Sequence, residues 1–131
     1  DKNAWYHFVW RFDTSQSTAS DRVRMYVNGK RLTSLQNATW PTQNEVSVQN
    51  NNHHHEIGAY NSGSSYQFSG YIADPQFIDG QALSPAAFGE YAASGTWNPK
   101  ALSFPRPNTG TTWSTSVHLE LIVYLKVRLN Q

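Results

Sequence analysis

Three groups of side chains in this 131-residue chain have types that could do chemistry: a histidine run, the acids, and aromatics beside amides. The run is His53, His54 and His55, followed by Glu56. Histidine is a good metal ligand, but adjacent residues of a strand point to opposite faces, so three imidazoles in a row cannot converge on one ion. We interpret the run as a polar loop that leads into a strand, and we predict no metal site.

The nine acidic residues are scattered along the chain. A glycosidase needs two carboxylates roughly 5 to 10 Å apart, and no two glutamates stand two or four residues apart, as a catalytic pair on one strand face would. Asp74 and Asp79 are near each other in sequence, but a turn explains Asp79 better. No G-x-S-x-G, phosphate-loop or zinc-ligand spacing is present. We predict no catalytic residue, and we expect that the chain is not an enzyme.

Six aromatic residues are expected in or beside loops, near Asn and Ser: Trp5, Trp40, Tyr60, Tyr66, Trp97 and Trp113. An apolar surface with a few placed polar groups is the usual composition of a ligand site, and aromatic rings beside amides suit a sugar. The alternative is that each aromatic packs in the core or at its rim. The candidate carbohydrate-binding residues are Trp40, Asn51, Asn52, His53, Tyr60 and Asn61.

Composition narrows the fold and the partners. Charged residues are 15% of the chain, against about 25% in an average domain, and aromatic residues are 14%. This mixture, with many polar turn residues, is typical of all-β proteins. A net charge of +1 does not favour nucleic acid, and no apolar run approaches the roughly 20 residues of a membrane span. With no cysteine, packing has to supply the stability. We find no signal peptide.

Period-2 alternation predicts a long strand near the start and a hairpin after it. Ala4 to Asp13 alternates over ten residues, and its second face is half apolar, so we expect a central or partly covered strand. Asn28-Gly29 supplies the two positive-φ residues of a type I′ turn between Arg22 and Leu35. Shorter strands are predicted at Glu45 to Gln49 and from His55 to Tyr60.

The stretch from Tyr66 to Tyr91 predicts a strand, a turn at Asp79-Gly80 and one short helix. Ser84 suits the N-cap of that helix and Pro85 its first position. The predicted core of the whole chain is apolar and lies mainly on alternate strand positions: Tyr6, Phe8, Trp10, Phe12, Val23, Met25, Val27, Ile57, Phe68, Ile72, Phe77, Ile78 and Phe88.

Residues 93–129 are predicted to form a loop followed by a strand. Residues 93–116 are rich in Pro and Gly and lack periodicity, so we predict an irregular loop. Residues 117–129 alternate and predict a C-terminal strand, which at about 3.3 Å per residue is longer than usual. We interpret residues 1–131 as a single, incomplete domain of a longer polypeptide.

Several segments together resemble one family. WYHFVWRFD followed by RVRMYVNGKRL, then His55-Glu56-Ile57-Gly58, then Phe68-Ser69-Gly70-Tyr71-Ile72-Ala73-Asp74, are similar to the ordered motifs of concanavalin A-like lectin/glucanase domains of the laminin-G-like, pentraxin-like type. FIDGQALSPAAFGE is most similar to versions in tail and virion proteins of marine phages. The similarity runs from Trp5 to about Lys100.

This resemblance implies an antiparallel β-sandwich, the concanavalin A-like jelly roll, with one short helix. It implies a virion or extracellular location, and calcium is common in the family, although no ligand set maps onto these residues. The E-x-D-x-x-E glucanase motif is absent. The function that it implies is a non-catalytic carbohydrate-binding module of a phage tail or virion protein, which binds a glycan or cell-surface polymer.

Two other functions stay open. One is a structural virion or adhesion module that binds protein neighbours without sugar; the least favoured is a glycoside hydrolase. Open sheet edges invite pairing, so we also expect a homo-oligomer. The fold carries lectins, adhesion modules and hydrolases alike, so the resemblance alone does not choose among them.

Overall fold

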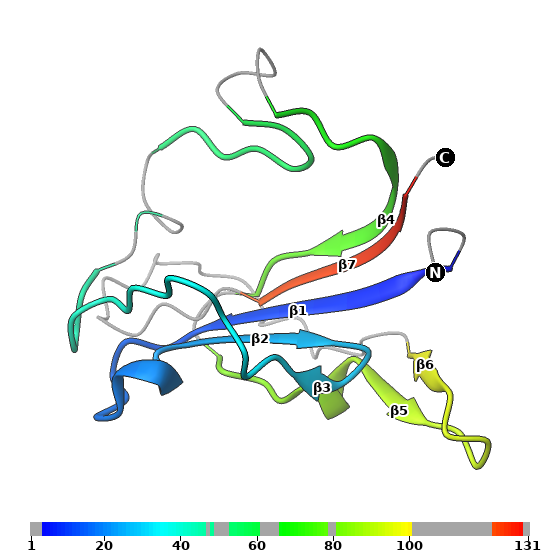
Figure 1. The fold of residues 1–131 in the computed structure, drawn as a ribbon, viewed down its shortest axis with the longest axis horizontal. Coiled ribbons are helices and arrows are strands. Elements are labelled where there is room, and N and C mark those ends of the chain that lie inside the picture. Colours follow the sequence, from blue (N-terminus) through cyan, green and yellow to red (C-terminus); the bar gives the residue numbers. More distant parts are fainter. Residues whose placement is uncertain are drawn as a thin grey trace, which may run out of the picture.

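The computed structural model describes residues 4–46, 48, 53–60, 66–78, 81–100 and 122–129, the last of these as backbone only. Within them the chain is all-β: it has seven strands, and its helices are short 3-10 turns, η1 (Ala19–Asp21) and η3 (Pro85–Ala87). The all-β prediction is therefore confirmed for the described part of the chain (Figure 1). None of the helices described there is long and apolar enough to cross a membrane.

The first strand and the hairpin after it form as the sequence predicts. Strand β1 (Tyr6–Phe12) pairs antiparallel with β2 (Val23–Val27), and β2 pairs with the short β3 (Lys30–Arg31). Asn28 and Gly29 have φ of 47° and 76°, as a type I′ turn requires. The return strand ends at Arg31, earlier than the sequence indicates.

Two further strands complete one sheet in the order β3-β2-β1-β7-β4. Strand β7 (Ile122–Leu129) lies between β1 and β4 (Gly70–Gln76) and is antiparallel to both. It falls within the predicted strand 117–129, whose first residues lie outside the described part. Strand β1 pairs on both edges, so it is the central strand that its half-apolar second face predicts.

A bulge interrupts β4. Ala73 pairs with Lys126 and Gln76 with Tyr124, so three steps along β4 match two along β7. Asp74, inside the bulge, has a φ of 55°, and Pro75 beside it has no N–H to give to a ladder. This local chemistry explains why the extra residue is accommodated here.

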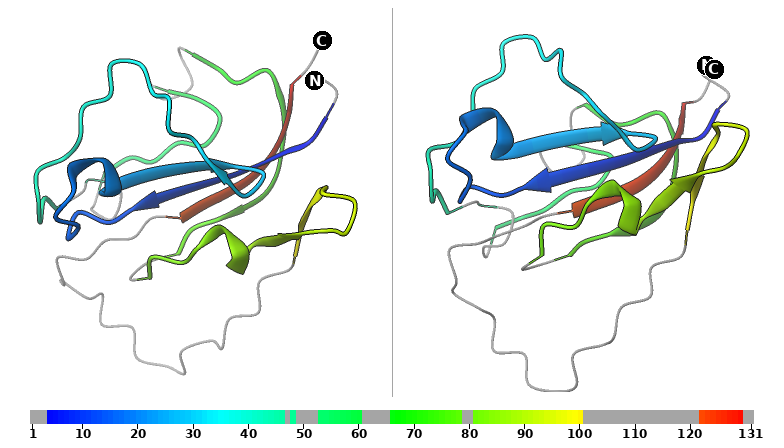
Figure 2. Two further views of the ribbon diagram at one scale, coloured as in Figure 1. Left: turned by 60° about the horizontal axis from the view of Figure 1, so that its bottom comes forward. Right: turned by 90° about the horizontal axis from the view of Figure 1, so that it is seen from below.

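A small hairpin lies on one side of the large sheet. It consists of β5 (Gly89–Tyr91) and β6 (Trp97–Pro99), and η3 comes directly before it. Figure 2 (right) shows this hairpin on one side of the sheet and the loop that follows β3 on the other. Strand β6 falls inside the segment predicted as irregular, 93–116; residues 101–116 lie outside the described part.

The short helix is smaller than the sequence indicates. A single 3-10 turn, η3, replaces the helix expected near Ser84 to Tyr91, and the Ser84 side chain makes no capping hydrogen bond. Pro85 does occupy a first helical position. The predicted strands at 45–49 and 55–60 are absent from their described residues. Asp79 and Gly80 lie outside the described residues.

The core lies on the face of β1 opposite to the predicted one. We call the face that carries His7, Val9 and Arg11 the covered face, and the face that carries Tyr6, Phe8, Trp10 and Phe12 the aromatic face. The buried apolar cluster is Val9, Ile78 and Phe88. Phe88 and Ile78 were predicted core residues and are confirmed, whereas Val9 was not predicted.

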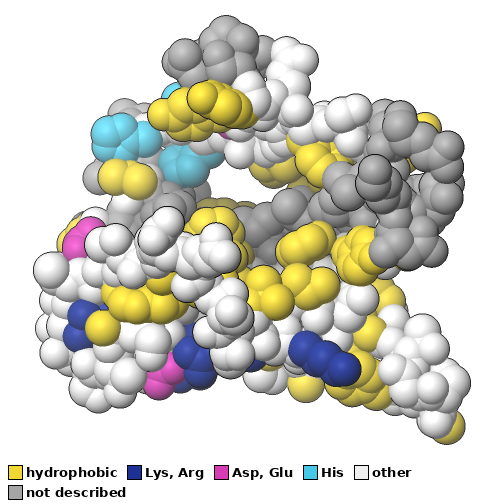
Figure 3. All heavy atoms as spheres, viewed as in Figure 1, with side chains coloured by type: hydrophobic (Ala, Val, Ile, Leu, Met, Phe, Trp, Pro, Cys, Tyr) yellow, Lys and Arg dark blue, Asp and Glu magenta, His cyan; other side chains and the backbone are white. Residues whose placement is uncertain are grey.

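Four predicted core residues are instead exposed: Phe8, Trp10, Ile57 and Phe77. The prediction chose the more apolar face of β1, but η3 and the β5–β6 hairpin cover the other one. The remaining predicted core residues are half-buried: Tyr6, Phe12, Val23, Met25, Val27, Phe68 and Ile72. Figure 3 shows hydrophobic side chains in a band across the middle of the molecule, where β1 and β2 run in Figure 1.

Candidate functional site

The six residues that the sequence nominates are not brought together. Asn51, Asn52 and Asn61 lie outside the described residues. Trp40 is half-buried, and His53 and Tyr60 are exposed. The Tyr60 ring lies 6.1 Å from that of Tyr66, and the His54 imidazole lies 3.6 Å from the Glu56 carboxylate. Neither of the two hollows described below includes Trp40, His53 or Tyr60.

A better site lies on the covered face, between the start of β1 and strand β6. This hollow, which we call the tryptophan hollow, has a volume of about 560 Å³, within the range of small-molecule sites. Strand β1, the β2–β3 turn, β4 and β6 all contribute to it. Its lining is Trp5, Tyr6, His7, Asn28, Ala73, Thr96, Trp97 and Pro99.

Trp97 is held by one directional bond and by close packing. Its indole Nε1–H donates to Nδ1 of His7 at 2.8 Å, and the two rings stack with centroids 5.6 Å apart. A Cβ atom built on Gly29 would lie 2.3 Å from the indole, and one on Gly89 would lie 2.5 Å from it. Both positions therefore have to be glycine for the ring to take this place.

The β2–β3 turn is tied to both the sheet and the hairpin. The His7 N–H donates to Oδ1 of Asn28 at 2.9 Å, and the Asn28 N–H donates to the His7 carbonyl at 2.8 Å. The Tyr91 hydroxyl donates to the Asn28 carbonyl at 2.8 Å, and its ring meets Trp97 edge-on. Asn28 is thus fixed as one wall of the tryptophan hollow.

Exposed aromatic surface borders the hollow. Trp5 is 47% exposed and Tyr71 is 57% exposed, and their ring centroids are 6.5 Å apart. Such rings offer a flat apolar surface, while the amide of Asn28 and the hydroxyl of Thr96 are groups that can hydrogen-bond a ligand. Among the described residues that line the hollow there is no carboxylate. Chemically, these described groups can stack on an uncharged ring and hydrogen-bond to it.

A second hollow of about 510 Å³ lies beside the same hairpin. Tyr26, Gly29, Ser84, Glu90 and Trp97 are among its lining residues. The Lys100 ammonium lies 3.8 Å from the Glu90 carboxylate across β5 and β6, and both side chains are well exposed. Among the described lining residues, Trp97 is common to this hollow and the tryptophan hollow.

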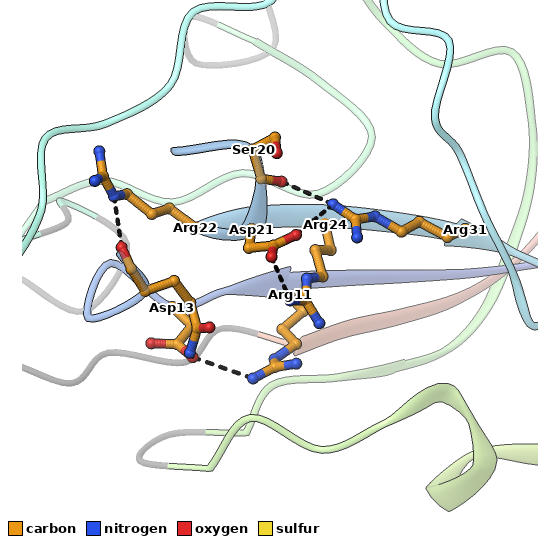
Figure 4. A network of polar contacts seen from close by, with 8 residues as sticks. Arg11, Asp13, Ser20, Asp21, Arg22, Arg24 and Arg31 are labelled. Carbon is orange, nitrogen blue, oxygen red and sulfur yellow. Dashed lines mark hydrogen bonds and ion pairs between the residues drawn. The ribbon is translucent and has the colours of Figure 1, made fainter. Parts of the chain in front are cut away.

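A polar network stabilises the other end of β1 (Figure 4). Asp13 is buried and accepts hydrogen bonds from Arg11, Ser15 and Gln16 at 2.6 to 3.2 Å. Burial raises the pKa of Asp13, but the hydrogen bonds from Ser15 and Gln16, with the charge of Arg11, outweigh burial and hold the pKa below its usual value. The carboxylate is therefore charged at neutral pH and fully engaged.

Calcium, which the family resemblance implies, has no fitting ligand set in the described residues. They contain no group of three or more His, Cys, Asp or Glu side chains that could hold a metal ion. The most enclosed carboxylate, Asp13, already accepts from the cationic Arg11. A cation would have to displace that charge, so we derive no chemistry through calcium.

Comparisons with known families, with curated proteins and with solved structures give no match. The site therefore rests on geometry alone. Sequence reasoning missed His7, Asn28 and Thr96 as lining residues. One signal was present: Trp5 and Trp97 stand beside loops like the aromatics that were chosen. Trp5 and Trp97 are far apart in the sequence, so local patterns could not show that β6 lies beside the start of β1.

Proposed function

We propose that this chain is a non-catalytic carbohydrate-recognition module, and that it binds sugar in the tryptophan hollow rather than at the predicted loops. The observation that carries the proposal is a hollow of ligand size with exposed Trp5 at its border, Trp97 in its wall and Asn28 and Thr96 beside them. Aromatic surface with a few placed polar groups is how proteins commonly hold small polar ligands.

The fold that goes with this proposal is a concanavalin A-like β-sandwich. The five-stranded sheet and the β5–β6 hairpin on its covered face are compatible with two layers. The described residues that line the hollow include no carboxylate, which supports a binding role over hydrolysis, since glycosidases use a pair of them. A virion or other extracellular location remains part of the proposal.

The test is binding to a panel of oligosaccharides, followed by calorimetry on the best ligand. Trp5→Ala removes an exposed ring of the hollow, and we expect affinity to fall about tenfold, the equivalent of about 1.4 kcal/mol. Tyr66→Ala is the matched control, because Tyr66 is 86% exposed and lies outside the hollow.

Tyr60→Ala separates the two candidate locations. If sugar binds at the predicted loops, this variant loses affinity and Trp5→Ala does not. If sugar binds in the tryptophan hollow, the order is reversed. A panel without any ligand, with and without calcium, would overturn the proposed function.

A second function is favoured by a different observation. The aromatic face leaves Phe8 37% and Trp10 44% exposed in the middle of the sheet, and apolar surface of this kind often marks a protein interface. A structural module that binds protein neighbours, including a second copy of this chain, would cover it. Light scattering of the wild type and of Trp10→Lys tests this: association in the first and its loss in the second would support it.

A further inference from the structure

Asn28, which lines the tryptophan hollow, has a carboxamide group with only its oxygen engaged. The His7 N–H donates to Oδ1 of Asn28 at 2.9 Å. Because a backbone N–H can only donate, the atom that it meets has to be the carboxamide oxygen, and Nδ2 is the other atom. No described residue accepts a hydrogen bond from Nδ2. Asn28 therefore has two N–H donors left for a ligand.

The Thr96 hydroxyl is the second polar group of the lining, and it too has an acceptor site in use. The Ser94 hydroxyl donates to Thr96 Oγ1 at 3.1 Å, and the Thr96 N–H donates to Ser94 Oγ at 3.4 Å. Thr96 Oγ1 accepts from Ser94 and keeps its own O–H for a ligand. The side chains of Asn28 and Thr96 thus both offer hydrogen-bond donors to the hollow.

A ligand group that matches this lining has an acceptor oxygen beside an apolar part, because Ala73, Pro99 and Trp97 add apolar surface to the hollow. An acetamido group combines a carbonyl oxygen with a methyl group, whereas a sugar hydroxyl is as much a donor as an acceptor. We propose that the tryptophan hollow recognises an N-acetylated sugar, and that Asn28 selects the acetamido carbonyl. This inference rests on the proposed function, since it names the class of sugar bound.

The backbone of Asn28 holds the donors in place without a ligand. Its N–H donates to the His7 carbonyl at 2.8 Å, and its carbonyl accepts from the Tyr91 hydroxyl at 2.8 Å. Its φ of 47° belongs to the type I′ turn. A donor that is already ordered loses little freedom on binding. It also discriminates against a ligand without an acceptor, because an unpaired buried donor costs free energy.

The first experiment measures, by calorimetry, the affinity of the wild-type chain for matched tetrasaccharides. The chitin-type tetramer of N-acetylglucosamine, the cellulose-type tetramer of glucose and the chitosan-type tetramer of glucosamine share one ring skeleton and differ in a single substituent. Stacking on Trp5 is therefore the same for all three. We expect the N-acetylated tetramer to bind about tenfold more tightly than the glucose tetramer, the gain of roughly one or two net hydrogen bonds. The glucosamine tetramer, whose ammonium group only donates, should bind most weakly.

The same three substituents are measured on the galactose ring, so that the result does not depend on one ring configuration. An unsubstituted sugar that binds as tightly as its N-acetylated counterpart overturns the inference. A tetramer of galacturonic acid that binds more tightly than every N-acetylated sugar also overturns it, because the selected acceptor would then be an anion. The inference fails as well if no N-acetylated sugar of either series binds.

The second experiment exchanges the donor for an acceptor at nearly constant shape. Asn28→Asp keeps an oxygen for the His7 N–H and tolerates the positive φ, but it puts a carboxylate oxygen in the place of Nδ2. The N-acetylated tetramer should lose affinity about tenfold and the glucosamine tetramer should gain it, so their order reverses. A merely structural role would weaken both alike. Asn28→Gly also suits a type I′ turn and removes the donor without adding an acceptor, so the preference should vanish without reversing.

Asn37→Asp is the matched control, because Asn37 has a φ of 53°, is exposed and is not among the described residues that line the hollow. It should keep the wild-type order of affinities, and a reversed order would contradict the assignment to Asn28. An unchanged preference in both Asn28 variants overturns the inference. The two proposals fail distinguishably: a chain that binds sugars without preferring the acetamido group retains the proposed function and loses this inference, whereas a chain that binds no sugar loses both.

Discussion

The more apolar face of β1 is the less buried of its two faces. The aromatic face has the larger side chains, yet Phe8 is 37% exposed, whereas Val9 on the covered face is 1% exposed. The difference comes from what lies across from each face: η3 and the β5–β6 hairpin bring Phe88 onto Val9. The apolar residues of a strand show which of its faces could be buried. The element that packs against the strand decides which face is buried.

The two faces of β1 also differ in the kind of contact that their side chains make. On the covered face, His7, Arg11 and Asp13 each make directional hydrogen bonds to named partners. On the aromatic face, Phe8, Trp10 and Phe12 have no polar group except the indole N–H of Trp10, so they contribute mainly apolar area. The covered face therefore specifies one arrangement, and substitutions there should cost more than substitutions of similar size on the aromatic face.

The largest expected effect is at Phe88. Phe88→Ala empties a fully buried position and should lower the free energy of unfolding by about 3–5 kcal/mol. Phe8→Ala, the same change on the aromatic face, should cost about 1 kcal/mol because much of that ring already contacts water. Urea unfolding of both variants gives the comparison; equal losses would remove the distinction between the faces.

Asp13 tests the polar end of the covered face. Asp13→Asn weakens the bonds from Arg11 and Gln16 and should cost about 1.5–3 kcal/mol at pH 7. Because the folded pKa is lowered, this stabilisation is present above the unfolded value of about 3.9 and is lost as the pH falls through the folded value.

Unfolding measured from pH 7 to pH 2 should therefore show a smaller acid loss for Asp13→Asn than for the wild type. Asp21→Asn is the control, since the Asp21 ion pairs to Arg24 and Arg31 lie at the surface and contribute less. A steeper acid dependence in Asp13→Asn would be incompatible with the network.

Gly89 tests the close packing of Trp97. A methyl group there meets the indole at 2.5 Å, and Gly89→Ala should cost about 1–3 kcal/mol from overpacking. In a Trp97→Leu background the obstacle is gone, so the same change should cost much less. A double-mutant cycle by thermal unfolding measures this coupling, and additive costs would show that the hairpin is placed differently.

The smallest effect is expected at Trp10. Trp10→Thr replaces a ring that is 44% exposed, and the free energy of unfolding should change by about 1 kcal/mol or less. Val9→Thr, one residue earlier, buries a hydroxyl and should cost about 1–3 kcal/mol. Thermal unfolding of the pair distinguishes the faces at adjacent positions; a larger loss at Trp10 would show that the aromatic face is covered in solution.

Local patterns predicted what depends on local chemistry. Strand β1 and the Asn28-Gly29 turn follow from alternation and from positive φ, and Phe88 follows from its place after a proline turn. The bond between His7 and Trp97 joins residues 90 positions apart. No local pattern encodes it, so the covered face and the tryptophan hollow could not be located before the fold was known.

The bulge in β4 changes which alternate residues of that strand lie on the covered face. Ala73 is in the row of His7 through Lys126, and Gln76 is in the row of Val9 through Tyr124, so the covered face carries odd positions before the bulge and even positions after it. This is why Ile78 is in the core and Phe77 is 52% exposed. One extra residue at Asp74 and Pro75 thus decides which of two adjacent apolar side chains the core receives, and a chain shortened by one residue there would present the phenylalanine instead.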